Sequence, residues 1–177
     1  LAVMQPTIDP DYDVEPNVIG IAAGGGVVTG KAVFNSDDAV NCKKPCILIR
    51  KETDPNDIAG MNAAVGILTS TGGLTSHAAV VARGLNKSCV VGTTDLKVNS
   101  DYATYAFHND LLCVETGELV TIDGSTGKVW FKDQVPILEG MVTKEVREVL
   151  KWSVREGTME KIVLSPDMTS DDMLKAI

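Results

Sequence analysis

The chain of 177 residues contains 44% hydrophobic but only 5% aromatic residues, which predicts one globular domain with an aliphatic core and at most a fragment of a second domain. A formal net charge of −8 argues against binding to nucleic acid or to anionic membrane surfaces. No signal peptide is visible and no apolar run is long enough to cross a bilayer. We therefore expect a cytoplasmic protein, although targeting of the complete protein to an organelle stays open. Because the chain begins at Leu1, we also expect a piece of a longer polypeptide.

The first 16 residues are acidic and contain three prolines, which is typical of a linker or an extended entry segment. Residues 18–23 then predict a strand. After a run of glycines, residues 27–34 favour a second strand, interrupted by Gly30.

Ser36 is the expected cap of a short helix over residues 37–41, and residues 46–50 form an apolar run typical of a buried strand. Asp54 then has the features of a helix cap, with Pro55 at the first helical position. We expect the start of this second helix to approach the turn that carries His77, described below.

The glycines before the second strand also fit G-x-x-x-x-G-K, the phosphate loop of nucleotide hydrolases, over residues 25–31. That loop requires Ser or Thr next and then a helix, whereas Ala32 follows here and continues a β-favouring run. A glycine-rich β-turn is therefore the preferred interpretation, and a nucleotide loop is the minor alternative.

Four cysteines lie at positions 42, 46, 89 and 113, which is not a paired C-x-x-C zinc pattern. We expect free thiols and no metal site in this chain. Cys42 and Cys46 flank two lysines, whose charge would favour a thiolate, but unreactive thiols remain the simpler interpretation.

The most informative stretch is residues 65–92, which reads as strand, glycine-rich turn, helix and strand. An apolar run over residues 65–69 is followed by Ser, Thr, Gly and Gly, which favour a tight turn. Thr75 or Ser76 is the expected helix cap, which places His77 in the first helical turn. Gly84 or Asn86 can end this helix in a left-handed conformation.

This arrangement suits a phosphoryl carrier. Free backbone N–H groups and the helix dipole make an anion site at a helix N-terminus. A neutral imidazole, His77 here, has the lone pair needed to attack phosphorus. The alternative is a structural histidine, but a glycine turn, two hydroxyls and a helix start converge on this one side chain. We therefore predict His77 as the nucleophile and Gly73, Thr75, Ser76 and Ala78 as residues that support the phosphate.

Beyond Gly92 the pattern predicts β-hairpins. Strand signals at 104–107 and 111–114 flank a turn with His108, which we interpret as a solvated loop residue. A second pair of strand signals lies at 119–123 and 128–131. Farther along, residues 139–157 have helical spacing and residues 162–164 favour a strand.

The segment Gly73-Leu74-Thr75-Ser76-His77-Ala78-Ala79-Val80-Val81-Ala82-Arg83-Gly84 resembles the phosphohistidine signature of the phosphoenolpyruvate (PEP)-utilising enzymes. Within that family it looks most like the pyruvate phosphate dikinases, which residues 47–61 and 123–127 also resemble. The resemblance implies an α/β swivelling domain of the β/β/α type, in which His77 carries phosphate between two distant sites. A regulatory phosphorylation site of plant dikinases matches Thr75, so the resemblance makes Thr75 a candidate for regulation.

The resemblance also implies a domain organisation: a linker over 1–16, the phosphohistidine domain over 17–132, and a connecting helix with the start of a PEP/pyruvate-binding barrel over 133–177. Partner domains of the same polypeptide would bind ATP, inorganic phosphate and pyruvate or PEP, with Mg²⁺ as their cofactor. The complete enzyme would be a homodimer, and this fragment would be inactive alone. A PEP synthase-like or enzyme I-like phosphotransferase, or a non-catalytic swivelling module, remains an alternative.

Two positions depart from the dikinase pattern. Thr71 stands where dikinases usually have an arginine, and Leu164 stands at the best match to an arginine on the first barrel strand. These departures are the reason for retaining the non-catalytic alternative. Two arginines also have open roles: Arg50 contacts phosphate or is a solvated charge, and Arg83 contacts phosphate or, as we favour, neutralises the end of the histidine helix.

Overall fold

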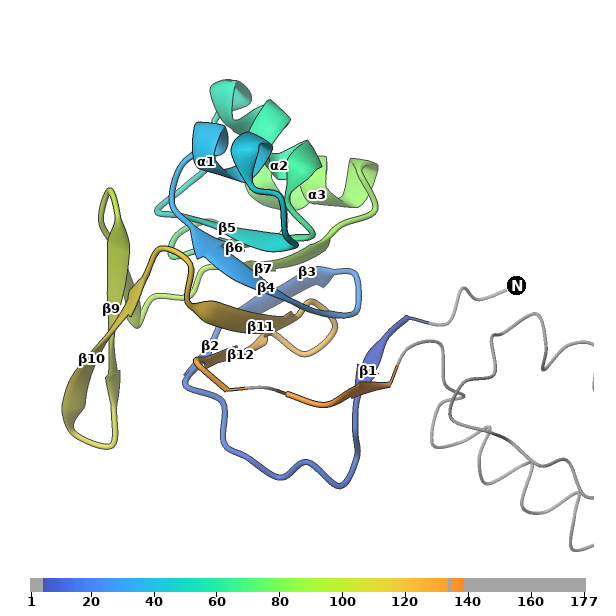
Figure 1. The fold of residues 1–177 in the computed structure, drawn as a ribbon. Helices are drawn as coiled ribbons and strands as arrows, with labels where there is room; N and C mark the ends of the chain where they lie inside the picture. Colours follow the sequence, from blue (N-terminus) through green and yellow to red (C-terminus); the bar gives the residue numbers. More distant parts are fainter. Residues whose placement is uncertain (1–4, 134, 139–177) are drawn as a thin grey trace, which may run out of the picture.

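A computed structural model describes residues 5–133 and 135–138 as a mixed α/β fold (Figure 1). The helix expected at 139–157, the strand expected at 162–164 and the departure at Leu164 lie outside the described residues. Within the described residues, no helix has the length and apolar character needed to cross a membrane.

The largest sheet has eight strands in the order β2-β12-β11-β4-β5-β6-β7-β3. Its central strands β4 to β7 run parallel to one another, whereas all the other pairings in the sheet are antiparallel. The strands are β2 (Val18–Ile19), β3 (Ile21–Gly24), β4 (Val27–Val33), β5 (Cys46–Arg50), β6 (Gly66–Thr69), β7 (Ser88–Val91), β11 (Leu119–Asp123) and β12 (Lys128–Phe131).

Three helices cover one face of the parallel strands (Figure 1). They are α1 (Ser36–Asn41), α2 (Ile58–Ala63), which follows the 3₁₀ turn η1 (Pro55–Asp57), and α3 (His77–Gly84). Alternate strand residues face opposite sides of a sheet, so Leu48 packs in the helix-side cluster while Ile47 and Ile49 pack on the other side. All three side chains are fully buried, which explains why this strand is a continuous apolar run.

A separate three-stranded sheet in the order β10-β9-β8 packs against the second face. It consists of β8 (Leu96–Val98), β9 (Tyr102–Phe107) and β10 (Asp110–Glu115). Tyr105 joins it to the main sheet, since its ring centroid lies 4.6 Å from that of Phe131. The first hairpin expected after Gly92 is the pair β9 and β10, and the second is the pair β11 and β12, so both predictions are confirmed. The α/β class is also confirmed.

The described part of the entry segment, residues 5–16, makes hydrogen bonds to later parts of the chain. Strand β1 (Thr7–Ile8) pairs antiparallel with β13 (Ile137–Leu138), so the first and last strands of the described region lie side by side. Farther along, the Trp130 indole N–H donates to the carbonyl of Val14 at 3.0 Å.

Three local predictions were wrong. Gly30 does not interrupt β4; a side chain there would collide with the Cys46 backbone, with a Cβ only 2.9 Å from the Cys46 Cα. The strand expected at 18–23 is divided at Gly20, because β2 pairs with β12 and β3 pairs with β7. Asn35 caps α1 by accepting from the Asp38 N–H, whereas the Ser36 hydroxyl accepts from the Gly60 N–H of α2 at 2.8 Å.

Candidate functional site

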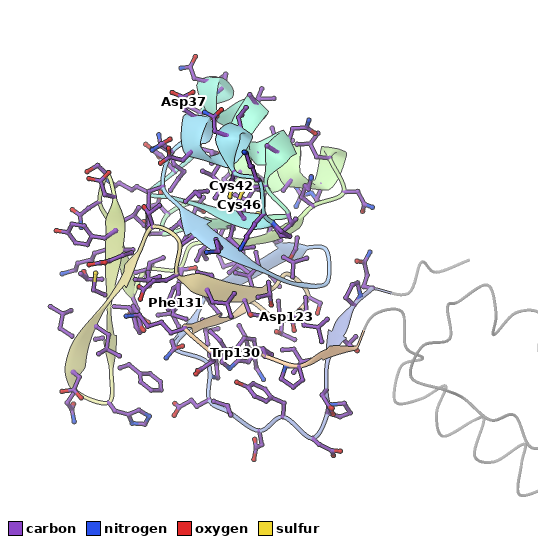
Figure 2. All side chains as sticks on the ribbon, in the orientation of Figure 1. Asp37, Cys42, Cys46, Asp123, Trp130 and Phe131 are labelled. Atoms are coloured by element: carbon purple, nitrogen blue, oxygen red, sulfur yellow. The ribbon has the colours of Figure 1, made fainter. Side chains whose placement is uncertain are left out.

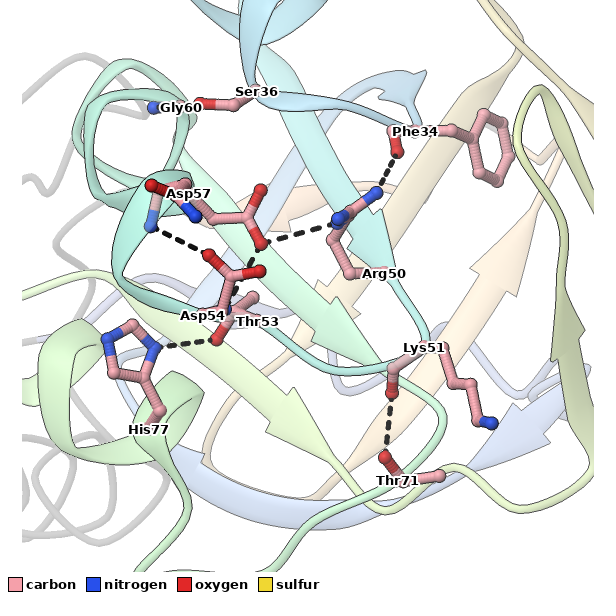
Figure 3. Close-up of polar contacts among 11 residues, drawn as sticks. Phe34, Ser36, Arg50, Lys51, Thr53, Asp54, Asp57, Gly60, Thr71 and His77 are labelled. Atoms are coloured by element: carbon pink, nitrogen blue, oxygen red, sulfur yellow. Dashed lines mark hydrogen bonds and ion pairs between the residues drawn. The ribbon is translucent and has the colours of Figure 1, made fainter.

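The site lies where two parallel strands end. The loop after β5 and the loop after β6 meet there, because the carboxyl ends of neighbouring parallel strands share one edge of a sheet. Backbone N–H groups of the second loop bind the first: Ser70 donates to the Arg50 carbonyl at 3.2 Å and Thr71 to the Lys51 carbonyl at 3.0 Å. The Thr71 hydroxyl also donates to the Lys51 carbonyl, at 2.9 Å (Figure 3). The two loops are therefore tied together before the histidine helix begins.

The turn before α3 depends on glycine. Gly72 has a φ of +97°, a conformation that side chains disfavour, and an added Cβ would lie 2.9 Å from the Ser76 Cβ. Of the two predicted candidates, Ser76 and not Thr75 is the helix cap, and its hydroxyl accepts from the Ala79 N–H at 3.4 Å. This cap places His77 at the first position of the helix.

The helix start presents unused donors. Among the described residues, the backbone N–H groups of His77 and Ala78 have no acceptor, as expected for the first turn of a helix. These two N–H groups point along the helix axis together with the positive end of its dipole. They can therefore donate hydrogen bonds to the oxygens of an anionic group carried by the His77 ring.

The histidine ring is held from the other loop. The Thr53 hydroxyl lies 3.0 Å from Nδ1 of His77 (Figure 3). Thr53 is only 7% exposed, so its hydroxyl has a fixed position. With Nδ1 engaged, Nε2 is the nitrogen left for chemistry, and it has a free lone pair when the proton sits on Nδ1 and the Thr53 hydroxyl accepts it.

A network of capping contacts fixes the backbone around Thr53. Asp54 caps η1 by accepting from the Asn56 N–H at 2.7 Å, as predicted. The buried Asp57 carboxylate accepts from the Asp54 N–H at 3.2 Å and pairs with Arg50 Nε at 3.4 Å. The loop that positions the histidine is thus rigid in its own right.

The structure gives both arginines local partners. Arg50 binds Asp57 and also donates from Nη1 to the Phe34 carbonyl at 3.2 Å, so it supports the Thr53 loop (Figure 3). Arg83 donates from Nη2 to the Leu74 carbonyl at 2.7 Å and so fastens the turn before His77.

A pocket of about 150 Å³ opens beside the histidine ring. Hydroxyl and small residues form most of its lining, which consists of Glu52, Thr53, Thr69, Thr71, Gly72, Ser76, His77 and Ala78. No lysine or arginine of the described chain lines it, and Glu52 adds a carboxylate. A phosphoryl group here would meet hydroxyl and N–H donors, whereas a strong positive charge would have to come from outside this pocket.

The remaining predicted site residues border the turn. Gly73 accepts from the Ser76 N–H at 2.9 Å, and nothing lies within 4 Å of a Cβ built on it, which leaves an open approach. Thr75 is exposed. The residue that sequence reasoning missed is Thr53; the available signal was the expectation that the neighbouring helix start approaches the histidine turn.

Residues 42–127 match the family model described as "PEP-utilising enzyme, mobile domain". Similar proteins include the pyruvate, phosphate dikinases of Clostridium symbiosum, 37% identical over 99% of this chain, and of Rhizobium meliloti (strain 1021), 40% identical over 85%. That of Entamoeba histolytica is 44% identical, also over 85% of the chain. The chain spans only 17% to 20% of the length of these relatives.

A solved solution structure of an enzyme I protein matches 68% of this chain and 40% of its own, with 23% identity and a TM-score of 0.39. The family model and the dikinase relatives agree on the segment that holds His77 and Thr53. This chain therefore belongs to the PEP-utilising enzymes and contains their mobile domain.

Proposed function

We propose that this chain is the phosphoryl-carrier domain of a pyruvate phosphate dikinase-like enzyme and that His77 carries the phosphoryl group on Nε2. The observation that carries the proposal is the 3.0 Å contact between Thr53 and Nδ1 of His77, at the start of α3. It orients the ring and leaves Nε2 as the reactive atom, on a residue that begins a helix whose first backbone N–H groups have no acceptor among the described residues. A structural histidine does not require this combination.

The transfer has two steps. First, the Nε2 lone pair attacks the phosphorus of a donor, the N–P bond forms, and the bond from phosphorus to the donor oxygen breaks. The Nδ1 proton stays on the ring and is held by Thr53, so the phosphorylated ring keeps the character of a good leaving group. In the second step an acceptor oxygen attacks the phosphorus, the N–P bond breaks, and neutral His77 returns.

The proposal extends to the complete protein. The donor and acceptor sites, for ATP with inorganic phosphate and for pyruvate or PEP, would lie in other domains of the same polypeptide. The short span of this chain within its relatives supports that arrangement. We propose residues 17–132 as the carrier domain, residues 133–177 as the connection to the next domain, a homodimeric assembly and a cytoplasmic location.

Magnesium fits the partner domains better than this one. Among the described residues, no three His, Cys, Asp or Glu side chains gather as a metal site. We therefore propose that Mg²⁺ acts with ATP and PEP in the other domains, and none of the steps above uses it. The exposed Thr75, two residues before the nucleophile, is proposed as a regulatory phosphorylation site.

The second candidate is a non-catalytic swivelling module. Thr71 favours it, because its hydroxyl binds the Lys51 carbonyl and adds no positive charge to the pocket. Such a module would dock like a carrier but would not be phosphorylated. Phosphorylation itself therefore separates the two candidates.

The experiment is to incubate the complete protein with isotopically labelled PEP or with ATP labelled in its phosphates, then digest it and locate the label. We expect label on His77, in a bond that is labile in acid and stable in base, as a phosphoramidate is. Label on His108, a base-labile ester on Ser or Thr, or no label would overturn the proposal. The 177-residue chain alone should not form PEP from ATP and pyruvate, because it lacks the clamps that stabilise charge in the transition state.

A further inference from the structure

Two thiols meet at the turn between α1 and β5, on the helix-covered side of the sheet. Cys42 directly follows α1, and Cys46 is the first residue of β5. Both residues approach the same atom: the Ala39 carbonyl accepts from the Cys42 N–H at 3.4 Å and from the Cys46 thiol at 3.8 Å. Figure 2 shows the two labelled side chains next to each other. The turn of residues 43–45 thus brings the two cysteines close together at the edge of the same apolar cluster.

The two thiols differ in accessibility. Cys46 is 1% exposed, whereas Cys42 is half-buried at the surface of the same apolar cluster. Burial raises the pKa of the Cys46 thiol to about 11; the neighbouring Cys42 raises it as well, and the charge of Lys87 opposes the shift. Cys42 is therefore the thiol that a dissolved oxidant meets first, and Cys46 is the partner behind it.

We propose that Cys42 and Cys46 form a reversible intradomain disulfide and that this pair is a site of oxidation by peroxide. The proposal is independent of phosphoryl transfer, since neither cysteine lines the pocket beside His77. An accessible thiol beside a second thiol is the arrangement expected of a redox-sensing pair in a reducing compartment, where such disulfides are transient.

The reaction proceeds in two balanced steps. The Cys42 thiol loses its proton, and the thiolate attacks one oxygen of hydrogen peroxide. The O–O bond breaks, Cys42 becomes a sulfenic acid, and the hydroxide that leaves takes up the released proton to form water. The Cys46 sulfur then attacks the Cys42 sulfur, the S–O bond breaks, and a second water leaves as the disulfide forms. Two thiols have lost two electrons and two protons to one peroxide. A dithiol reductant reverses the change by thiol–disulfide exchange.

The other two cysteines provide internal controls. Cys89 is buried in β7, and its thiol lies 3.9 Å from the Ala78 carbonyl beneath α3. Cys113 is half-buried on β10, in the separate three-stranded sheet. Cys113 has accessibility of the same class as Cys42 but sits in another layer of the fold. If accessibility alone decided the outcome, peroxide would oxidise both Cys42 and Cys113. A paired site instead predicts a disulfide only between Cys42 and Cys46.

The test treats the folded 177-residue chain with hydrogen peroxide, blocks remaining thiols with iodoacetamide in denaturant, and digests it with trypsin. Cleavage after Lys43 separates peptides 32–43 and 44–50, so they stay joined only through a disulfide. We expect the joined pair, two hydrogens lighter than the sum of the separate peptides, and its disappearance after dithiothreitol. The Cys42→Ser variant should lose it, and the matched Cys113→Ser variant should keep it.

Each other outcome overturns the proposal. Cys42 oxidised to a sulfinic acid while Cys46 is alkylated would show that the second thiol does not capture the sulfenic acid. Linkage of either cysteine to Cys89 or Cys113 would show unfolding or a different pairing. Both thiols alkylated after peroxide treatment would show that the site is inert. Circular dichroism of the treated chain confirms that the reaction occurred in the folded state.

Discussion

The parallel half of the molecule, with strands β4 to β7 and helices α1 to α3, differs sharply from the antiparallel half with strands β8 to β12. Each half contains one of the two histidines of the sequence. His77 lies at a helix start, in contact with Thr53 from a neighbouring loop. His108 lies in a hairpin turn with a φ of +48°, and its ion pair with Glu15, at 3.1 Å, joins two side chains that are each 66% exposed.

This contrast follows from strand direction. Parallel strands need helical crossovers, so the loops at their carboxyl ends converge on one edge and can build a pocket together. Antiparallel hairpins place successive turns at opposite ends of the strands, and the turn between β9 and β10, which carries His108, is exposed. Convergence of loops, and not the presence of a histidine, distinguishes the candidate site from the hairpin turn.

The largest expected effect tests this contrast directly. His77→Ala in the complete protein should abolish the overall reaction, because no other residue in the pocket offers a nitrogen nucleophile. His108→Ala is the matched control and should retain near-normal turnover. A steady-state assay of PEP formation compares the two. Turnover that survives in the His77→Ala variant would mean that phosphate does not travel through this residue.

The free energy of unfolding should fall more when a buried leucine is truncated than when an exposed one is. Leu48→Ala removes a fully buried side chain of β5 and should lower the free energy of unfolding by about 2–5 kcal/mol. Leu111→Ala, at a hairpin leucine that is 75% exposed, should change it by less than about 0.5 kcal/mol. Urea unfolding followed by circular dichroism measures both. Equal losses in the two variants would contradict the packing described for β5.

The buried thiol beneath α3 should make stability depend on pH. Burial raises the pKa of Cys89 to about 12, with the charge of Arg83 opposing the shift. In the unfolded chain this thiol loses its proton at about pH 8.5, whereas in the folded chain it stays protonated up to about pH 12. Stability should therefore fall as the pH rises through this window, by up to about 1.4 kcal/mol per pH unit for this one group.

Replacement of the thiol reveals its share of that slope. Cys89→Ala should flatten the decline in unfolding free energy between about pH 9 and about pH 11, and Cys113→Ala should leave the decline unchanged. Part of the decline remains in the first variant, because the pKa of Cys46 is also raised, to about 11. An identical slope in the wild-type chain and the Cys89→Ala variant would show that this thiol already ionises in the folded state.

The smallest effect concerns ring orientation. Thr53→Val keeps the side-chain shape but removes the hydroxyl that binds Nδ1, and should slow phosphorylation of His77 by about threefold to tenfold. Thr53→Ser should restore the rate. Thr29→Val removes a comparable hydroxyl, 2.6 Å from that of Thr121, and should leave the rate unchanged. Rapid-quench measurement of the rate of His77 phosphorylation distinguishes these three variants. A Thr53→Val rate equal to that of the wild type would remove Thr53 from the mechanism.

Local sequence signals were sufficient for most of the elements. The apolar run of β5, the Asp54 cap and the hairpins of the second sheet were all predictable, because each depends on residues close together in the chain. The placement of His77 behind the Ser76 cap was predictable for the same reason. The errors at Gly20 and Gly30 arose because their surroundings come from other parts of the sequence: β12 and β7 pair on either side of Gly20, and Val120 of β11 pairs with Gly30.

Contacts between distant segments were decided by the tertiary structure. Thr53 lies 24 residues before His77, and only the parallel pairing of β5 with β6 brings their loops together. Arg50 carries a positive charge that suits a phosphate ligand. In the structure, however, its guanidinium pairs with Asp57 and so supports the loop that contains Thr53. The sequence by itself was enough to predict His77 as the nucleophile, since helix capping and glycine turns are local. The orientation of its ring was decided by a hydroxyl that no local pattern assigns to it.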